Sequence, residues 1–102
     1  MPNPALTEAV YYILLSLLTP LHGYGVMQRV EELSSGRVRL AAGTLYGAIT
    51  SLLDRGWICA LPENGRKKEY VVTRAGRAAL LEEHRRLREL YENGAKLLED
   101  QV

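Results

Sequence analysis

Residues 43–56 (GTLYGAITSLLDRG) constrain the fold of this chain more than any other stretch. Apolar side chains recur there at helical spacing, which predicts a helix of about three turns with one buried face. The apolar positions are Leu45, Ala48, Ile49, Leu52 and Leu53. The other face carries small and hydroxylic side chains, and Gly56 is a typical residue for ending a helix.

A second helix is predicted just upstream, from about Tyr24 to Leu33. Its inward side chains are expected to be Val26, Met27, Val30 and Leu33. A short linker, residues 36–42, joins it to the helix that begins near Gly43. Helix, turn and helix in this order are typical of proteins that read DNA.

Charge is unevenly distributed along the chain, although the formal net charge is only +1. Residues 37–77 hold eight basic and three acidic side chains, whereas the segments before and after them each carry two more acidic than basic side chains. A basic middle segment is expected to face a polyanion such as nucleic acid. A solvated surface would show the same pattern, so charge alone leaves both interpretations open.

A β-hairpin is predicted after the helix at residues 43–56. Trp57–Leu61 and Glu69–Thr73 have the composition of strands, and Asn64-Gly65 between them is a strong turn signal. The basic shoulder of this hairpin consists of Arg66, Lys67 and Lys68. Such cations suit contacts with phosphate groups, although a soluble loop tip would have the same composition.

The first predicted helix runs from about Ala5 to Leu18, is apolar on nearly every side, and ends before Pro20. A domain of this size cannot easily cover both sides of such a helix. We therefore expect a second copy of the chain to cover one of them. Tyr11 and Tyr12 lie in this helix. Adjacent tyrosines there indicate either core and interface packing or the lining of a ligand cavity.

A long last helix is predicted from about Arg74 to Glu99, with Thr73 as its N-cap. Its side chains follow a heptad-like spacing that is typical of helices that pair. The residues of this seam are Leu80, His84, Leu87, Tyr91, Gly94 and Leu98. A helix of about 25 residues would project from so small a domain, which favours self-association.

The sequence does not indicate an enzyme. His22, His84 and Cys59 have no paired spacing among them, so no metal site, cofactor or catalytic activity is expected. Cys59 alternates with Trp57 along a predicted strand, which predicts a buried, inert thiol. The chain opens without a signal peptide, and its apolar run at residues 10–18 is shorter than the roughly 20 residues that cross a bilayer. We therefore expect a cytoplasmic protein without a membrane partner.

Five short strings occur in order along the chain. They are HGYG at residues 22–25, GTLY at 43–46, DRGWI at 54–58, RKKEY at 66–70 and TRAG at 73–76. In this order and spacing they resemble the PadR family of bacterial winged helix-turn-helix transcriptional regulators, and the single terminal helix is similar to the short subgroup of that family. The resemblance implies a homodimer, made by the first and last helices, that binds a pseudo-palindromic operator and usually represses transcription.

The resemblance also implies roles for individual residues. The reading helix falls on residues 43–55, where Thr44 and Tyr46 would reach the DNA, while Tyr24 and Gln28 would contact phosphates. The implied DNA contacts are Tyr24, Gln28, Gly43, Thr44, Tyr46, Gly47, Thr50, Ser51, Arg66, Lys67 and Lys68. No arginine or lysine stands early on the reading face, so base specificity is expected to depend on hydroxyls, methyl contacts and DNA shape.

Some members of the PadR family bind aromatic effectors between the first and last helices of the dimer. By the match of the motifs, Tyr11, Tyr12, Leu87 and Tyr91 approach that cavity in this chain, and simple dimer packing is the alternative. The implied dimer interface comprises Leu80, His84, Leu87, Tyr91 and Leu98.

We therefore expect a mainly α fold with a small β-hairpin. A winged helix-turn-helix DNA-binding domain is expected at residues 1–73 and a dimerisation helix at residues 74–102. The expected function is that of a DNA-binding transcriptional regulator, a homodimeric repressor that a small aromatic effector could release. The alternative is a winged-helix module that binds protein and no DNA.

Overall fold

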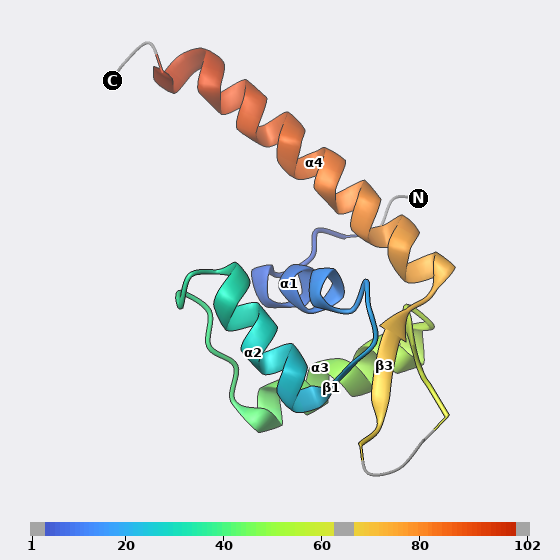
Figure 1. The fold of residues 1–102 in the computed structure, drawn as a ribbon. Coiled ribbons are helices and arrows are strands. Elements are labelled where there is room, and N and C mark those ends of the chain that lie inside the picture. Colours follow the sequence, from blue (N-terminus) through green and yellow to red (C-terminus); the bar gives the residue numbers. More distant parts are fainter. Residues whose placement is uncertain (1–3, 63–66, 100–102) are drawn as a thin grey trace.

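The computed structural model describes residues 4–62 and 67–99, which form four helices and three short strands (Figure 1). The elements are α1 (Glu8–Ser16), β1 (Leu21–His22), α2 (Gly23–Leu33), α3 (Ala42–Arg55), β2 (Ile58–Ala60), β3 (Glu69–Val72) and α4 (Arg74–Leu98). The helices α1, α2 and α3 pack together with the small sheet at their side, and α4 extends away from them. The expected fold class, mainly α with a small β element and a long last helix, is confirmed.

The first helix, α1, is shorter than predicted. We expected it at residues 5–18, but it runs from Glu8 to Ser16. Thr7 sets the start, because its hydroxyl accepts a hydrogen bond at 3.2 Å from the amide three residues further on. The buried hydroxyl of Ser16 donates at 2.7 Å to the carbonyl three residues earlier, where the helix ends. Apolar periodicity does not reveal these side-chain hydrogen bonds.

Both α2 and α3 begin within one residue of the predicted starts and end where predicted. Gly56 ends α3 in the left-handed conformation with φ of +75°, which glycine adopts without strain. The amide of Trp57 then donates to the carbonyl of Leu52 at 3.0 Å and closes the turn.

Two leucines that we predicted to be buried are exposed. Leu33 is 41% exposed because it is the final residue of α2, and the next residue, Ser34, takes the buried place. Leu53 is 37% exposed, while Leu52 beside it is buried. Successive residues of a helix point about 100° apart, so only one of the two leucines can face the core.

Within the described residues, the strands form an antiparallel sheet in the order β1-β3-β2. Cys59 of β2 pairs with Val71 of β3, and Leu21 of β1 pairs with Tyr70 of β3. The pairing of β2 with β3 confirms the predicted hairpin, whereas β1 was not expected because it is only two residues long. The predicted Asn64-Gly65 turn lies outside the described residues.

Cys59 is exposed, so the prediction of a buried thiol is wrong. Its neighbour Ile58 is 2% exposed and fills the inward position of β2. Trp57 is also buried but precedes β2, so the alternation of the strand does not continue from it.

One apolar core joins α1, α2, α3, the sheet and the first half of α4. Its residues are Ile13, Leu14, Leu17, Val26, Val30, Leu45, Ile49, Leu52, Trp57, Ile58, Tyr70, Ala79 and Leu80. The amide of Val72 donates to the carbonyl of Leu17 at 2.9 Å, which ties β3 to the end of α1. Leu80, a residue of the predicted dimer seam, is therefore covered by its own chain.

Thr73 joins the end of α3 to the start of α4. Its hydroxyl accepts from the amide of Gly76 at 3.1 Å, as predicted for an N-cap, and donates to the carbonyl of Gly56 at 2.6 Å. Its amide donates to the carbonyl of Trp57 at 2.9 Å. We call these hydrogen bonds the Thr73 joint.

The second half of α4 extends beyond the rest of the molecule (Figure 1). The helix ends at Leu98, one residue before the predicted end, and the residues that it buries all lie in its first half. From Leu87 onward its large apolar side chains are exposed, and Tyr91 reaches 71% exposure. This part of α4 has an apolar surface that its own chain does not cover.

Gly76→Ala should destabilise the protein by about 2 kcal/mol, because overpacking against the backbone forces the helix to shift. A Cβ atom at Gly76 would lie 2.8 Å from the carbonyl carbon of Trp57. Gly47→Ala, within α3, is the matched control, since a Cβ atom there would meet open space. This control should stabilise the protein by up to about 1 kcal/mol. Urea unfolding measures both changes, and equal effects would contradict the packing described at Gly76.

Candidate nucleic-acid interface

The helix α3 has one buried and one exposed face, as the sequence predicted. Leu45, Ile49 and Leu52 are buried in the core. The predicted DNA contacts of this helix, Gly43, Thr44, Tyr46, Gly47, Thr50 and Ser51, are all exposed. The hydroxyl of Thr50 donates to the carbonyl of Tyr46 at 3.0 Å, so its oxygen remains able to accept a hydrogen bond from a base.

The N-terminal end of α3 is open to an anion. Ala41 occupies the N-cap position and has no side-chain oxygen with which to accept from the amides of the first turn. The first amides of a helix point outward along its axis, where they can donate to a phosphate. Gly43 in this turn has open space around its Cα, so a ligand backbone could approach closely.

A hollow of about 350 Å³ lies between the start of α2, α3 and β3. We call it the α2–wing hollow, where the wing is β2, β3 and the basic residues before β3. Its lining residues are His22, Gly23, Tyr24, Tyr46, Lys67, Lys68 and Tyr70. Four predicted DNA contacts thus meet at one place: one tyrosine from α2, one tyrosine from α3 and two adjacent lysines that precede β3.

The ring of Tyr46 lies against the start of α2 in the α2–wing hollow. A Cβ atom added to Gly23 would lie 2.7 Å from Cζ of this ring, so a larger residue at position 23 would displace the ring. His22 lies beside them, with its Nε2 atom 3.5 Å from Nζ of Lys67. We had not predicted His22 and Gly23 as site residues, although both belong to the HGYG string.

Gln28, a predicted contact on α2, is not a lining residue of this hollow. It is exposed one turn after Tyr24, and these two residues line a different hollow together with Glu31 and Glu32. Carboxylates beside Gln28 make this position less favourable for a phosphate. Arg66, the first of the three basic residues of the wing, lies outside the described residues.

Another hollow, of about 360 Å³, lies between α1 and α4, and we call it the α1–α4 hollow. Its lining residues are Leu6, Thr7, Glu8, Tyr11, Tyr12, Glu83, Arg86 and Leu87. Three of the four predicted effector residues are therefore together, while Tyr91 lies outside this lining. The rings of Tyr11 and Tyr12 are 6.5 Å apart in an edge-on arrangement, and the hydroxyl of Tyr11 lies 3.0 Å from Nδ1 of His84.

Ionised and neutral groups meet in the α1–α4 hollow. Glu83 is only 5% exposed, and its carboxylate accepts a hydrogen bond from Nε of Arg86 at 3.0 Å. This hydrogen bond lowers the pKa of Glu83 below its ordinary value, although burial acts in the opposite direction. Burial, together with the charge of Glu83, raises the pKa of Tyr11, so its phenol stays protonated at neutral pH. Neither Glu83 nor Arg86 was predicted as a site residue, because charged side chains beside the apolar seam of a helix are typical of a solvated surface.

In residues 4–62 and 67–99, no group of three or more histidine, cysteine or acidic side chains could hold a metal ion. No helix in these ranges combines the length and the apolar character that a bilayer span requires.

The fold and the arrangement of α2, α3 and the wing define a winged helix-turn-helix protein. Residues 13–82 match the Transcriptional regulator PadR-like family, which is most of the chain. The chain therefore belongs to the PadR family of transcriptional regulators, as its five strings predicted. Regulators of this family bind DNA.

Several relatives are similar to this chain. It is 32% identical over 75 residues to the transcriptional regulator YqjI of Escherichia coli K12, and 39% identical over 61 residues to an uncharacterised 37.1 kDa protein of transposon Tn4556 from Streptomyces fradiae. The two matches cover 74% and 60% of this chain, respectively. They span only 36% of the first relative and 17% of the second.

Solved structures share the fold along most of the chain. A PadR family regulator from Eggerthella lenta is 28% identical, with a TM-score of 0.73 and 88% of this chain and 80% of that chain covered. One from Clostridium difficile R20291 is 22% identical, with a TM-score of 0.75 and coverage of 89% and 99%. BpsR of Bordetella bronchiseptica, whose DNA binding is regulated by 6-hydroxynicotinic acid, is 19% identical, with a TM-score of 0.70 and coverage of 93% and 69%.

Proposed function

We propose that this chain is a homodimeric transcriptional repressor that acts in the cytoplasm and binds a pseudo-palindromic operator. The observation that carries the proposal is the α2–wing hollow, which groups Tyr24, Tyr46, Lys67 and Lys68 beside the exposed polar face of α3. In this proposal α3 enters the major groove, while the start of α2 and the wing hold the flanking phosphates. Two winged helix-turn-helix domains, one from each protomer and related by a two-fold axis, would each bind one half-site of the operator.

Base recognition by α3 would depend on small side chains. Thr44, Thr50 and Ser51 offer hydroxyl groups, and the threonines add methyl groups that can contact thymine. A bidentate arginine or lysine contact to guanine is worth about 1–3 kcal/mol of discrimination, and the first turns of α3 carry neither residue. We therefore propose that DNA shape and deformability supply much of the operator preference.

Lys67→Ala with Lys68→Ala should weaken binding to every DNA sequence. Each lost phosphate contact lowers the slope of log affinity against log salt by about one, so the double variant should lose about two for each protomer, or about four for a dimer on its operator. Fluorescence anisotropy titrations at several salt concentrations measure both quantities. The control is Arg85→Ala with Arg88→Ala, which removes the same charge from exposed positions on α4. An unchanged slope in the lysine variant, or an equal loss in the control, would remove the wing from the mechanism.

The alternative proposal is a winged-helix module that binds protein and no DNA. The lack of a basic residue early on the exposed face of α3 favours it. The two lysines in the α2–wing hollow favour DNA, because cations there suit phosphate groups. A wild-type protein with no affinity for any duplex at low salt would place the alternative first.

The proposed dimer rests on the second half of α4. Large apolar side chains are exposed there, and an apolar surface of this kind marks an interaction site in soluble proteins. They are Leu87, Leu90, Tyr91, Leu97 and Leu98. Pairing through the seam residues Leu87, Tyr91 and Leu98 would cover part of this surface and set the distance between the two winged helix-turn-helix domains.

Leu98→Asp or Leu87→Asp should convert the dimer to monomers, because the seam would bury a carboxylate without a partner. Sedimentation velocity measures the change. Leu81→Asp is the matched control, since Leu81 is an exposed leucine of the same helix outside the seam. An intact dimer in both seam variants, or dissociation in the control as well, would contradict this interface.

We also propose that the α1–α4 hollow binds a small aromatic effector that releases the operator. Tyr11 and Tyr12 offer ring surfaces, and Glu83 with Arg86 offers polar groups for a substituent on a ligand. Regulation of BpsR by 6-hydroxynicotinic acid supports an aromatic effector in a related fold. Simple packing of the dimer against the same residues is the alternative.

A further inference from the structure

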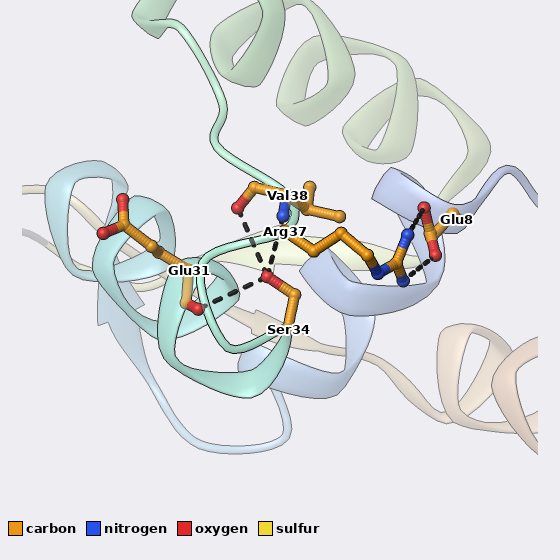
Figure 2. Close-up of polar contacts among 5 residues, drawn as sticks. All are labelled: Glu8, Glu31, Ser34, Arg37 and Val38. Carbon is orange, nitrogen blue, oxygen red and sulfur yellow. Dashed lines mark hydrogen bonds and ion pairs between the residues drawn. The ribbon is translucent and has the colours of Figure 1, made fainter.

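The loop between α2 and α3, residues 34–41, is held at its start by Ser34. The hydroxyl of Ser34 accepts from the amide of Val38 at 2.9 Å and lies 3.3 Å from the carbonyl of Glu31, to which it can donate (Figure 2). Ser34 is buried, so these hydrogen bonds are shielded from water. Arg37 lies inside the turn that they close.

Arg37 reaches from this loop to α1. Its Nη1 atom donates to Oε1 of Glu8 at 3.0 Å, and its Nη2 atom donates to the second carboxylate oxygen of Glu8 (Figure 2). A two-point contact of this kind fixes the geometry of both side chains, unlike most exposed ion pairs. The hydrogen bond from Arg37 lowers the pKa of Glu8, so the carboxylate is ionised at neutral pH.

The α1 partners of Arg37 also belong to the α1–α4 hollow. The hydrogen bonds to Glu8 raise the pKa of Arg37, and the side chain of Tyr12 acts in the same direction. Glu8 and Tyr12 are lining residues of that hollow. One side chain of the loop that leads into α3 is therefore bonded to a lining residue of the hollow.

A second arginine of the same loop behaves differently. Arg39 lies 3.8 Å from a carboxylate oxygen of Glu31, which belongs to α2. This pair connects the loop only to the helix that precedes it, and it makes a single, longer contact. Arg39 is therefore an internal comparison for Arg37, with the same charge on the same loop.

We propose that Arg37 is a positioning residue of the DNA interface, which clamps the α2–α3 loop to α1 and so links the α1–α4 hollow to the first turn of α3. This inference rests on the proposed function, because it assigns a role in DNA binding to a residue outside the predicted contacts. Arg37 acts through the loop and does not itself neutralise a phosphate.

Glu8→Gln gives the sharpest test, because electrostatics and positioning predict opposite signs. Removing a carboxylate makes the protein more positive, so charge alone would tighten DNA binding. Positioning predicts a loss of affinity for a preferred operator of about two- to five-fold, the effect expected when a well-formed exposed pair is lost. Arg37→Gln should show a similar loss with an unchanged salt slope, and the double variant should lose no more than Arg37→Gln alone.

The matched controls are Glu31→Gln and Arg39→Gln, which make the same charge changes at the neighbouring pair. Glu31→Gln should leave operator affinity unchanged or tighten it, because its pair does not reach α1. Exchanging the charges, Glu8→Arg with Arg37→Glu, should restore part of the lost affinity by rebuilding the pair. Tighter binding by Glu8→Gln, or a salt slope lowered by about one for each protomer in Arg37→Gln, would overturn the inference.

Hydrogen exchange provides a readout that needs no DNA. In the free protein, the backbone amides of residues 38–44 should exchange faster in Glu8→Gln and Arg37→Gln than in wild type or in the two controls. Unchanged exchange in the Glu8 and Arg37 variants would overturn the clamp even if DNA binding is strong. A wild type that binds no DNA would instead overturn the proposed function and the DNA role of Arg37, while exchange would still decide whether the clamp exists.

Discussion

The Thr73 joint is the interaction on which the arrangement of the whole molecule depends. Its hydroxyl bonds to the residue that ends α3 and caps the helix that begins α4, so these two helix ends cannot move independently. Gly76 packs against the backbone at Trp57 beside this joint, where a larger residue would not fit. The direction in which α4 extends from the rest of the molecule is therefore fixed relative to α3. In a dimer made through α4, this angle would set the spacing of the two proposed reading helices.

The two ends of α3 are controlled from different parts of the chain. Its C-terminal end is held by Gly56 and the Thr73 joint, within a short stretch of sequence. Its N-terminal end follows a loop that Arg37 ties to α1, 29 residues earlier in the chain. The first connection combines a side-chain and a backbone hydrogen bond from Thr73, whereas the second is an exposed ion pair between two long side chains, which is easier to break. The C-terminal end of α3 is therefore held more rigidly than the loop that leads into its N-terminal end.

Local signals in the sequence were sufficient for most of the fold and for part of the site. Gly56 predicted the end of α3 and Thr73 predicted the start of α4, because a helix stop and an N-cap depend on neighbouring residues. The amphipathic pattern failed at Leu53 and at Cys59, where periodicity could not decide which of two adjacent residues faces the core. Contacts between distant residues left no local signal. Examples are the Arg37–Glu8 pair and the fit of Tyr46 against the start of α2.

The most direct test of the account is a fluorescence anisotropy titration of the wild-type protein. The DNA is the intergenic duplex upstream of its own gene, with an unrelated duplex of equal length as the control, at two salt concentrations. The account predicts that at near-physiological salt the upstream duplex is bound about 10³-fold or more tightly than the control. Equal and salt-labile binding to both duplexes would contradict operator recognition by α3 at that site, and no binding to either would contradict the DNA interface itself.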